Sequence, residues 1–198
     1  SINLFNKSKK IVSMGHRNVQ GLFYDSRLQE IWSTEHGPEG GDEINLNSLG
    51  NNPSIQNYGW PIASYGEHYG VGSYGDSEAR RKVDPRYIKA PLLKSHSKMG
   101  FVEPQKSYTP SIGISEIVKV DLVGKSDVFV IGAMGSNVEE GDMSIHFLAK
   151  SENSLETIVT IPLSERVRDL FLVNQMDSLL YVGETSGVIG VISLKNGK

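Results

Sequence analysis

The sequence predicts an all-β fold arranged as part of a β-propeller. Short runs of β-branched and aromatic residues recur along the chain between Gly, Asn, Asp and Lys. The sequence shows no stretch with the 3.6-residue periodicity of an amphipathic helix. Pairs of the short runs repeat, and because one blade of antiparallel strands cannot bury both of its faces, such repetition is typical of stacked blades. A plain β-meander or β-sandwich is the alternative interpretation of the same repeat.

The predicted strands follow these runs in chain order. They are Ile2–Phe5, Gly21–Tyr24, Glu30–Ser33, Glu43–Leu46, Glu116–Val120, Val128–Gly132, Ile145–Ala149, Thr157–Ile161, Asp169–Val173, Leu179–Gly183 and Val188–Leu194. The repeated pairs begin with QGLFYD, SEIVKVD and VRDLFLV, and a third strand follows each pair. INLFN and KKIVSMG precede them as the outer strands of a blade whose inner strands are missing.

This count predicts about two and a half blades, whereas a closed ring needs about four or more. Both flanks are therefore expected to expose apolar blade faces or unpaired strand edges, which recruit other strands. The expected protein partner is either the missing part of the ring or a second copy of the chain.

Composition excludes several classes of partner. The 198 residues carry 20 Lys and Arg against 23 Asp and Glu, a formal net charge of −3, and the positive charges form no long stripe. Nucleic acid is therefore not expected. The sequence has no apolar run long enough for a membrane span and no basic-then-apolar segment typical of a signal peptide. The absence of cysteine excludes disulfides and thiolate metal sites.

A glycine-rich segment, HGPEGGDE at residues 36–43, indicates a cation site. Calcium takes about six to eight oxygen ligands, often backbone carbonyls of a tight turn together with nearby carboxylates. Gly37 and Pro38 lie in such a turn, and Asp42 and Glu43 supply negative charge. Because side chains alternate along a strand, these two acids point to opposite faces, and Glu43 is the preferred ligand. In the alternative interpretation both acids only cap the turn.

Two arginines near the C-terminus indicate an anionic ligand. Arg166 and Arg168 are two positions apart, so a strand would direct both to one face. Two guanidinium groups on one face repel each other unless an anion lies between them, and their forks suit carboxylates. The alternative is a pair of surface arginines neutralised by Glu165 and Asp169, and Asp169 is the expected orienter of an arginine.

Three motifs follow one another in the first third of the chain: GHRNVQGLFYD (15–25), STEHGPEGGDEINL (33–46) and NYGWP (57–61). In this order they resemble the signature of the glucose/sorbosone dehydrogenase family, and the resemblance continues through SERVRDL (164–170) to the C-terminus. It implies a six-bladed propeller of which residues 1–198 form the C-terminal half, with a long inter-strand insertion at about 48–112. It also implies oxidation of the C1 of an aldose to a lactone, with hydride transfer to pyrroloquinoline quinone (PQQ), in the periplasm or outside the cell.

The resemblance assigns roles to nine residues of this sequence. The PQQ-binding positions are Arg17, Asn18, Arg166 and Arg168. The calcium-binding positions are Gly37 and Pro38 for the ion that holds the quinone, and Glu43, Tyr58 and Tyr69 for a second, structural ion. The implied cofactors are thus PQQ and calcium, and the implied substrate is a small aldose.

Two departures from the family pattern bear on activity. Gly135 stands where the family has a lysine that reaches the quinone. The family's catalytic base is a histidine in the N-terminal half of the propeller, and none of the five histidines here matches it. Because such a base is worth about 10²–10⁴ in rate, this chain alone is expected to be inactive. His16 and His36 are expected to be structural hydrogen-bonding residues.

Three functions stay open at this point. The first is part of a quinone-dependent aldose dehydrogenase. The second is a non-catalytic, calcium-stabilised propeller that acts as a binding module, which the glycine at position 135 favours. The third is a metal-dependent lactonase-type propeller, in which a divalent ion activates water and for which Glu43 and Asn18 are the available ligands. Trp60 either stacks on a ligand or anchors its loop as a buried aromatic residue.

Overall fold

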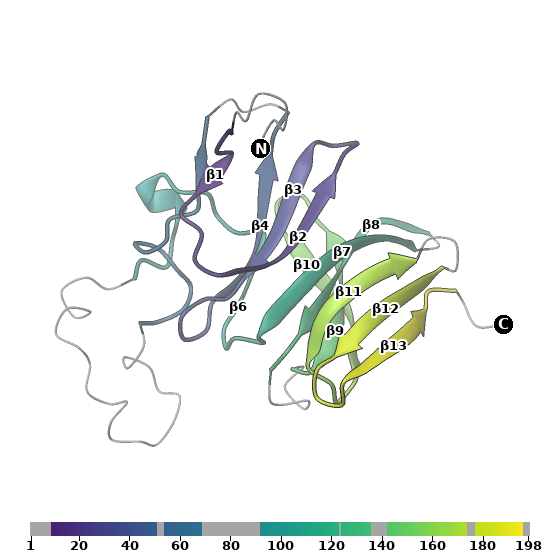
Figure 1. Ribbon diagram of the computed structural model, residues 1–198. Helices are drawn as coiled ribbons and strands as arrows, with labels where there is room; N and C mark the ends of the chain where they lie inside the picture. The colour runs from purple at the N-terminus through teal and green to yellow at the C-terminus, as the bar shows by residue number, and fades with distance from the viewer. Residues whose placement is uncertain are drawn as a thin grey trace, which may run out of the picture.

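The computed structural model describes residues 9–50, 54–68, 92–122, 124–135, 142–173 and 177–195. Within these ranges the chain is all-β, with one short 3-10 helix, η2 (Ser97–Met99). Its strands form three antiparallel sheets that lie side by side as successive propeller blades (Figure 1). The predicted all-β, partial-propeller fold is confirmed. None of the described residues belongs to a helix long and apolar enough to cross a membrane.

Each sheet is antiparallel, and chain order matches spatial order in all three. Blade 1 contains β2 (Val19–Asp25), β3 (Glu30–Glu35), β4 (Asp42–Ser48) and β6 (Lys106–Tyr108). Blade 2 contains β7 (Ile114–Leu122), β8 (Lys125–Ala133), β9 (Ser144–Lys150) and β10 (Leu155–Pro162). Blade 3 contains β11 (Val167–Val173), β12 (Ser178–Gly183) and β13 (Val188–Ser193).

The sequence located the long strands and missed the short ones. Every predicted strand from Gly21 onward is present within a residue or a few of its predicted ends, whereas Ile2–Phe5 lies outside the described residues. KKIVSMG was expected to be an outer blade strand, and this was wrong: β1 (Ser13–Met14) pairs in parallel with β5 (Gln56–Asn57) in a small separate sheet. The fourth strand of blade 1, β6, was not predicted because three residues are too few to show an alternation.

Two apolar clusters hold the blades together. The first lies between blades 1 and 2, where the Trp32 and Phe129 rings pack with centroids 4.2 Å apart. The second lies between blades 2 and 3 and includes Val130, Val167 and Leu179. Each fully buried large apolar side chain contributes about 1.5–3 kcal/mol relative to an exposed one, so these two interfaces are the main source of stability.

The first strands of the three blades, β2, β7 and β11, are neighbours in parallel orientation (Figure 1). A Cβ on Gly21 would lie 2.8 Å from the Glu116 Cα, so only glycine allows β2 to approach β7 this closely. Polar side chains cross both boundaries. Thr34 Oγ1 donates to the Ser115 carbonyl, and Ser115 Oγ donates to the Val167 carbonyl at 2.5 Å. The three blades are therefore joined by buried hydrogen bonds as well as by apolar packing.

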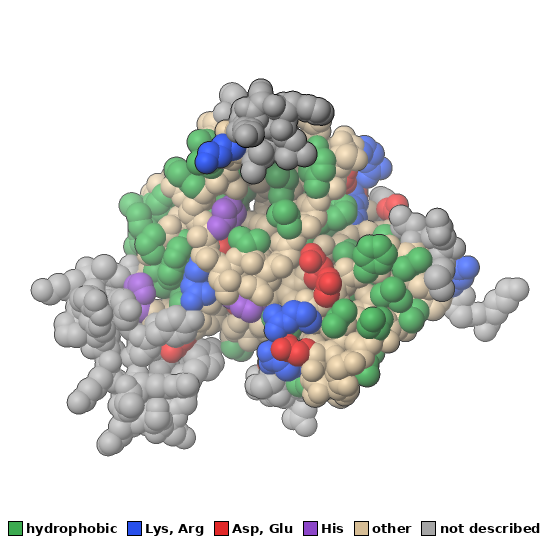
Figure 2. Space-filling model, in the orientation of Figure 1, with side chains coloured by type: hydrophobic (Ala, Val, Ile, Leu, Met, Phe, Trp, Pro, Cys, Tyr) green, Lys and Arg blue, Asp and Glu red, His purple; other side chains and the backbone are tan. Residues whose placement is uncertain are grey.

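Blade 3 leaves one apolar face in solvent. Phe171, Val191 and Ile189 are 65, 60 and 74% exposed. The strand register places all three on one face of β11–β12–β13, since Phe171 pairs with Leu180, Leu180 with Val191, and Ile189 is two residues from Val191. Figure 2 shows hydrophobic side chains gathered over this part of the molecule. A face of this kind marks an interaction surface.

We predict that the chain of residues 1–198 self-associates through this face. Dynamic light scattering at micromolar concentration should show a species larger than a monomer. Replacing Ile189 and Val191 with threonine should reduce the apparent size, because threonine keeps strand propensity and removes apolar surface. Leu28→Thr, at another exposed apolar position, is the matched control and should change nothing. A stable wild-type monomer would contradict the prediction.

Candidate functional site

The predicted ligand residues lie at one end of the propeller's inner strands. Arg17 and Asn18 directly precede β2, Gly113 directly precedes β7, and Arg166 directly precedes β11. Hydrogen bonds through Met134 connect the starts of β7 and β11, because the Met134 N–H donates to the Gly113 carbonyl and the Arg166 guanidinium donates to the Met134 carbonyl. Because the three strands run in parallel, their amino ends bring motif residues far apart in the sequence to one end of the fold.

The glycine loop, residues 36–41, joins β3 to β4 at this end. Gly40 and Gly41 have φ angles of 77° and 69°, which favour glycine. Gly37 is needed for space, since a Cβ there would lie 2.1 Å from the Gly40 carbonyl oxygen. The loop is thus a tight, irregular turn, as its composition predicted.

Two side chains fix the glycine loop to blade 2. His36 Nε2 lies 2.7 Å from the Ile114 carbonyl oxygen. The Asp42 carboxylate is fully buried and accepts the Gly37 N–H at 3.2 Å and the Ile114 N–H at 3.0 Å. Asp42 and Glu43 point to opposite faces of β4, as strand alternation predicted. The expected structural hydrogen bonding of His36 is seen in the structure.

Glu35, at the end of β3, organises the segment before β2. Its carboxylate accepts the Arg17 backbone N–H at 2.7 Å and the Asn45 side-chain amide at 2.6 Å, and it lies 3.1 Å from His16 Nδ1. Burial alone would raise the pKa of Glu35, but the hydrogen bonds from His16, Arg17 and Asn45 outweigh burial and lower it. Glu35 is therefore ionised at neutral pH, and His16 is a structural hydrogen-bonding residue as expected.

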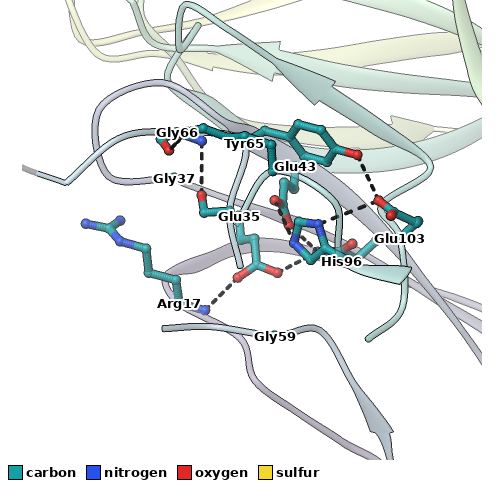
Figure 3. Close-up of polar contacts among 12 residues, drawn as sticks. Arg17, Glu35, Gly37, Glu43, Gly59, Tyr65, Gly66, His96 and Glu103 are labelled. Carbon is teal, nitrogen blue, oxygen red and sulfur yellow. Dashed lines mark hydrogen bonds and ion pairs between the residues drawn. The ribbon is translucent and has the colours of Figure 1, made fainter. Parts of the chain in front are cut away.

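Glu43, His96 and Glu103 form a cluster beside Glu35 (Figure 3). The His96 ring, 1% exposed, lies between the two carboxylates, with Nε2 3.5 Å from Glu43 and Nδ1 3.6 Å from Glu103. Among the described residues, neither ring nitrogen has a hydrogen-bond partner, and neither does the buried Asn45 Oδ1. Buried polar atoms of this kind call for a ligand, water or ion.

Burial and charge set different protonation states in this group. Burial, reinforced by the charge of Glu35, raises the pKa of Glu43 to about 8. Burial also lowers the pKa of His96, so its ring is neutral at pH 7 and does not balance a charge on Glu43. Glu103 remains ionised, because hydrogen bonds from Ser97 and Tyr65 outweigh burial and lower its pKa to about 2. Without a cation, Glu43 is mostly protonated at neutral pH.

Arg17 and Asn18 differ in how they are held. Arg17 Nη1 donates to the His36 carbonyl at 2.9 Å, and its guanidinium lies 5.3 Å from the Trp60 ring centroid. Trp60 is half-buried, and its ring supports the Arg17 side chain. The exposed Asn18 accepts a hydrogen bond from the Gln20 side chain through Oδ1.

Arg166 and Arg168 face the same way, as their spacing predicted. Both contact one carboxylate oxygen of Glu184, at 3.4 and 2.9 Å. The prediction that Glu165 and Asp169 pair with these arginines was wrong. Glu165 accepts the Ser186 N–H instead, and Asp169 accepts the Leu170 N–H. Glu184 neutralises the pair only partly, since one carboxylate faces two exposed guanidinium groups.

The remaining predicted positions are the ligands Tyr58 and Tyr69 and the glycine at position 135, where the family has a lysine. The buried Tyr58 donates its hydroxyl to the Leu46 carbonyl at 2.7 Å and stacks on His16, so only its backbone is available to an ion. Tyr69 lies outside the described residues. Gly135 packs against Asp142, where a Cβ would lie 2.2 Å from the carboxylate carbon. A side chain at position 135 would therefore displace Asp142.

The site residues line a narrow cavity of about 10 Å³, bordered by Arg17, Gly37, Glu43 and Tyr58. A larger depression of about 640 Å³ lies at the opposite ends of the inner strands. Its cations already have partners, with Arg27 paired with Asp127, Lys119 with Asp25 and Lys195 with Asp177. The buried atoms without a hydrogen-bond partner, in His96 and Asn45, lie beside Glu43, which borders the narrow cavity.

Sequence reasoning missed four residues of this site. Glu35 and Asn45 gave a usable signal, because strand alternation places them on the same face as Glu43 and register pairs Glu35 with Glu43. His96 and Glu103 gave none, since they lie in an irregular segment. Among the described residues, no group of three or more His, Asp or Glu side chains is arranged to hold a metal ion by itself. A cation here would need backbone carbonyls.

The three blades, with polar loops gathered at one end of the fold, define part of a β-propeller. The family model described as Glucose / Sorbosone dehydrogenase matches residues 2–189. The chain therefore belongs to the glucose/sorbosone dehydrogenase family, as its motifs predicted.

Curated relatives match this chain over part of their length. The uncharacterized protein slr1608 of Synechocystis is 29% identical over 165 residues, covering 81% of this chain and 33% of that protein. Aldose sugar dehydrogenase YliI of Escherichia coli is 45% identical over 60 residues, covering 30% of this chain and 15% of YliI. Quinoprotein glucose dehydrogenase B of Acinetobacter calcoaceticus is 38% identical over 73 residues, covering 36% and 14%. The chain thus spans a third or less of these relatives' lengths.

Solved structures show the same fold. The apo-form of the soluble aldose sugar dehydrogenase from Escherichia coli superposes with a TM-score of 0.61 at 22% identity, covering 90% of this chain and 45% of that one. The PQQ-bound aldose sugar dehydrogenase from Streptomyces coelicolor gives a TM-score of 0.52 at 20% identity, covering 90% and 43%. This chain covers a little under half of each of these two propeller chains.

We predict that Glu43 destabilises the calcium-free fold as pH rises. Its folded pKa of about 8 lies above the ordinary value of 4.5, so between these values the folded state binds more protons than the unfolded state, and stability falls with rising pH. The slope is at most about 1.4 kcal/mol per pH unit.

The test compares wild type with Glu43→Gln by urea unfolding in chelator between pH 5 and 9. Glutamine keeps the shape without the titration, so Glu43→Gln should become the more stable of the two as pH rises toward 8. A constant stability difference across this range would show that Glu43 has an ordinary pKa.

Proposed function

We propose that this chain supplies the calcium- and quinone-binding half of a PQQ-dependent sugar dehydrogenase. The observation that carries the proposal is the position of three motifs at one end of the fold: GHRN directly precedes β2, ERVRD spans the start of β11, and the HGPEGGDE loop between β3 and β4 contacts the start of β7. Membership of the glucose/sorbosone dehydrogenase family supports it. In the proposed reaction the C1 of an aldose is oxidised to a lactone, in the periplasm or outside the cell.

The arginines fit an anionic cofactor. PQQ is a planar tricarboxylate, and guanidinium forks bind carboxylates through pairs of charge-assisted hydrogen bonds. Arg166 and Arg168 share one carboxylate and are both exposed or half-buried, so further carboxylates can reach them. Arg17 is already oriented by the His36 carbonyl and Trp60. Asn18 adds an exposed amide beside it.

The residues around Glu43 fit a calcium ion. Glu43 is a buried carboxylate whose charge no neighbouring cation balances, and the unpartnered Asn45 Oδ1 lies in the same group. Glu103 adds a carboxylate that is ionised at neutral pH. Tyr58 would add its backbone oxygen to this structural ion, whereas the glycine loop offers the carbonyls of Gly37 and Pro38 to the separate ion that would hold the quinone.

In the proposed mechanism these residues bind and orient the cofactor and the ion. PQQ, when bound, supplies the electrophile that accepts hydride from the sugar. Arg166, Arg168 and Arg17 would hold the carboxylates of PQQ, and the Gly37 and Pro38 carbonyls of the glycine loop would hold calcium. The catalytic base belongs to the other part of the propeller, so residues 1–198 alone bind the cofactor without turnover.

We predict that calcium stabilises this chain. An ion bound only by the folded state adds about 2.7 kcal/mol at a hundred times its Kd, and its charge would favour the ionised form of Glu43. The melting temperature should therefore rise with millimolar calcium and fall on chelation. Glu43→Gln should reduce this response, whereas Glu67→Gln, a half-exposed acid paired with Lys94, should keep it. A melting temperature unmoved by calcium or chelator would refute the proposed cation site.

We also predict that Arg168→Ala weakens PQQ binding roughly ten- to a hundredfold in a protein with the complete propeller, because a charge-assisted fork contributes about 1.5–3 kcal/mol. Fluorescence titration with PQQ measures the Kd. Lys195→Ala is the matched control, since Lys195 is an exposed cation that pairs with Asp177 at the opposite end of the inner strands. An unchanged Kd for Arg168→Ala would favour a non-catalytic propeller in which Arg166 and Arg168 serve only Glu184.

A further inference from the structure

We propose that Asp42 is a positioning residue for the cation site: it holds the glycine loop in its binding shape and locks that loop to blade 2. Asp42 has no place among the expected ligands, because its carboxylate points away from Glu43 and toward backbone N–H groups. The inference rests on the proposed function, and it names the side chain that builds the calcium-binding turn.

The geometry of Asp42 is that of a bridge between two segments. One carboxylate oxygen accepts the Gly37 N–H from inside the glycine loop, and the other accepts the Ile114 N–H at the start of β7. The two segments are 77 residues apart in sequence. His36 makes a second link between the same partners, since its ring nitrogen contacts the Ile114 carbonyl. Both backbone groups of Ile114 are thus held by blade 1.

Position 42 needs a side chain with two acceptor oxygens, one for each of the two backbone N–H groups. A buried carboxylate is costly unless each oxygen is hydrogen-bonded, and Asp42 meets this condition with two backbone donors. Asparagine has the same shape but only one oxygen acceptor, so its amide group would face one of the two N–H donors. Asp42→Asn therefore removes one half of the bridge and leaves the volume unchanged.

The loop needs such a bridge because its own backbone is unusually free. Gly37, Gly40 and Gly41 give the unbound loop many conformations, and glycine loses more backbone entropy on ordering than any other residue. If Asp42 orders the loop before the ion arrives, calcium binding does not bear that cost. Residues that orient metal ligands without touching the metal typically change metal affinity by about 10–100-fold when replaced.

The experiment measures loop order and calcium affinity separately in the chain of residues 1–198. Amide hydrogen exchange in chelator reports the protection of Gly37 and of residues 39–41, and isothermal titration with calcium chloride gives the Kd. For Asp42→Asn we expect faster exchange throughout the loop and a Kd weaker by roughly tenfold or more. Asp42→Glu, which keeps the charge but moves the carboxylate by one methylene, should show the same losses and serves if the asparagine variant does not fold.

Two controls separate positioning from general effects. Thr34→Val removes another buried hydrogen bond between blades 1 and 2, to the Ser115 carbonyl, and should lower the melting temperature without changing loop exchange or the Kd. Glu39→Gln removes one negative charge from the same loop and should leave exchange unchanged. If the wild type binds calcium, and Asp42→Asn has the same Kd and the same loop exchange as the wild type, this inference alone is overturned. A wild-type chain that binds no calcium would overturn the proposed cation site and this inference with it.

Discussion

The buried carboxylate of Glu35 is the interaction on which the rest of the site depends. It accepts the Arg17 backbone N–H and the Asn45 amide, and His16 contacts it from the same segment as Arg17. The segment before β2 has no strand partner at these residues, so Glu35 takes the place of a backbone ladder there. Its charge also acts at a distance, because it raises the pKa of Glu43. One carboxylate thus orders Arg17, the arginine proposed to bind the quinone, and places negative charge beside Glu43.

The fold could be predicted from sequence where strands are long enough to show alternation. In blades 2 and 3 the runs around Ile117, Val130 and Leu170 have apolar residues on the buried face, and the structure places strands there. β6 could not be predicted, since its register depends on tertiary contact with β4. The same holds for β1 and β5, whose parallel pairing joins two segments that each have only two paired residues.

The site was predictable only in part, and for a physical reason. Motif residues such as Arg17 and Gly37 belong to one continuous signature, so the sequence pointed to them directly. His96 and Glu103 reach the site through an irregular segment, and no local pattern indicates where such a segment will fold. Glu184 shows the same limit, because it meets Arg166 and Arg168 through the β11–β12 pairing. Strand pairing therefore decided the partners that spacing alone left open.

The hydrogen bonds that cross the inner strands bear on how this molecule comes apart. In repeat proteins whose units interact weakly, one unit can unfold while its neighbours remain intact. Here Ser115 contacts blade 1 through its carbonyl and blade 3 through its hydroxyl, so one residue of blade 2 belongs to both boundaries. Loss of the middle blade would break both hydrogen bonds and expose the apolar side chains of blades 1 and 3 that pack against it. The three blades consequently form one cooperative unit, and a partly melted intermediate that keeps only a single blade is not a stable species.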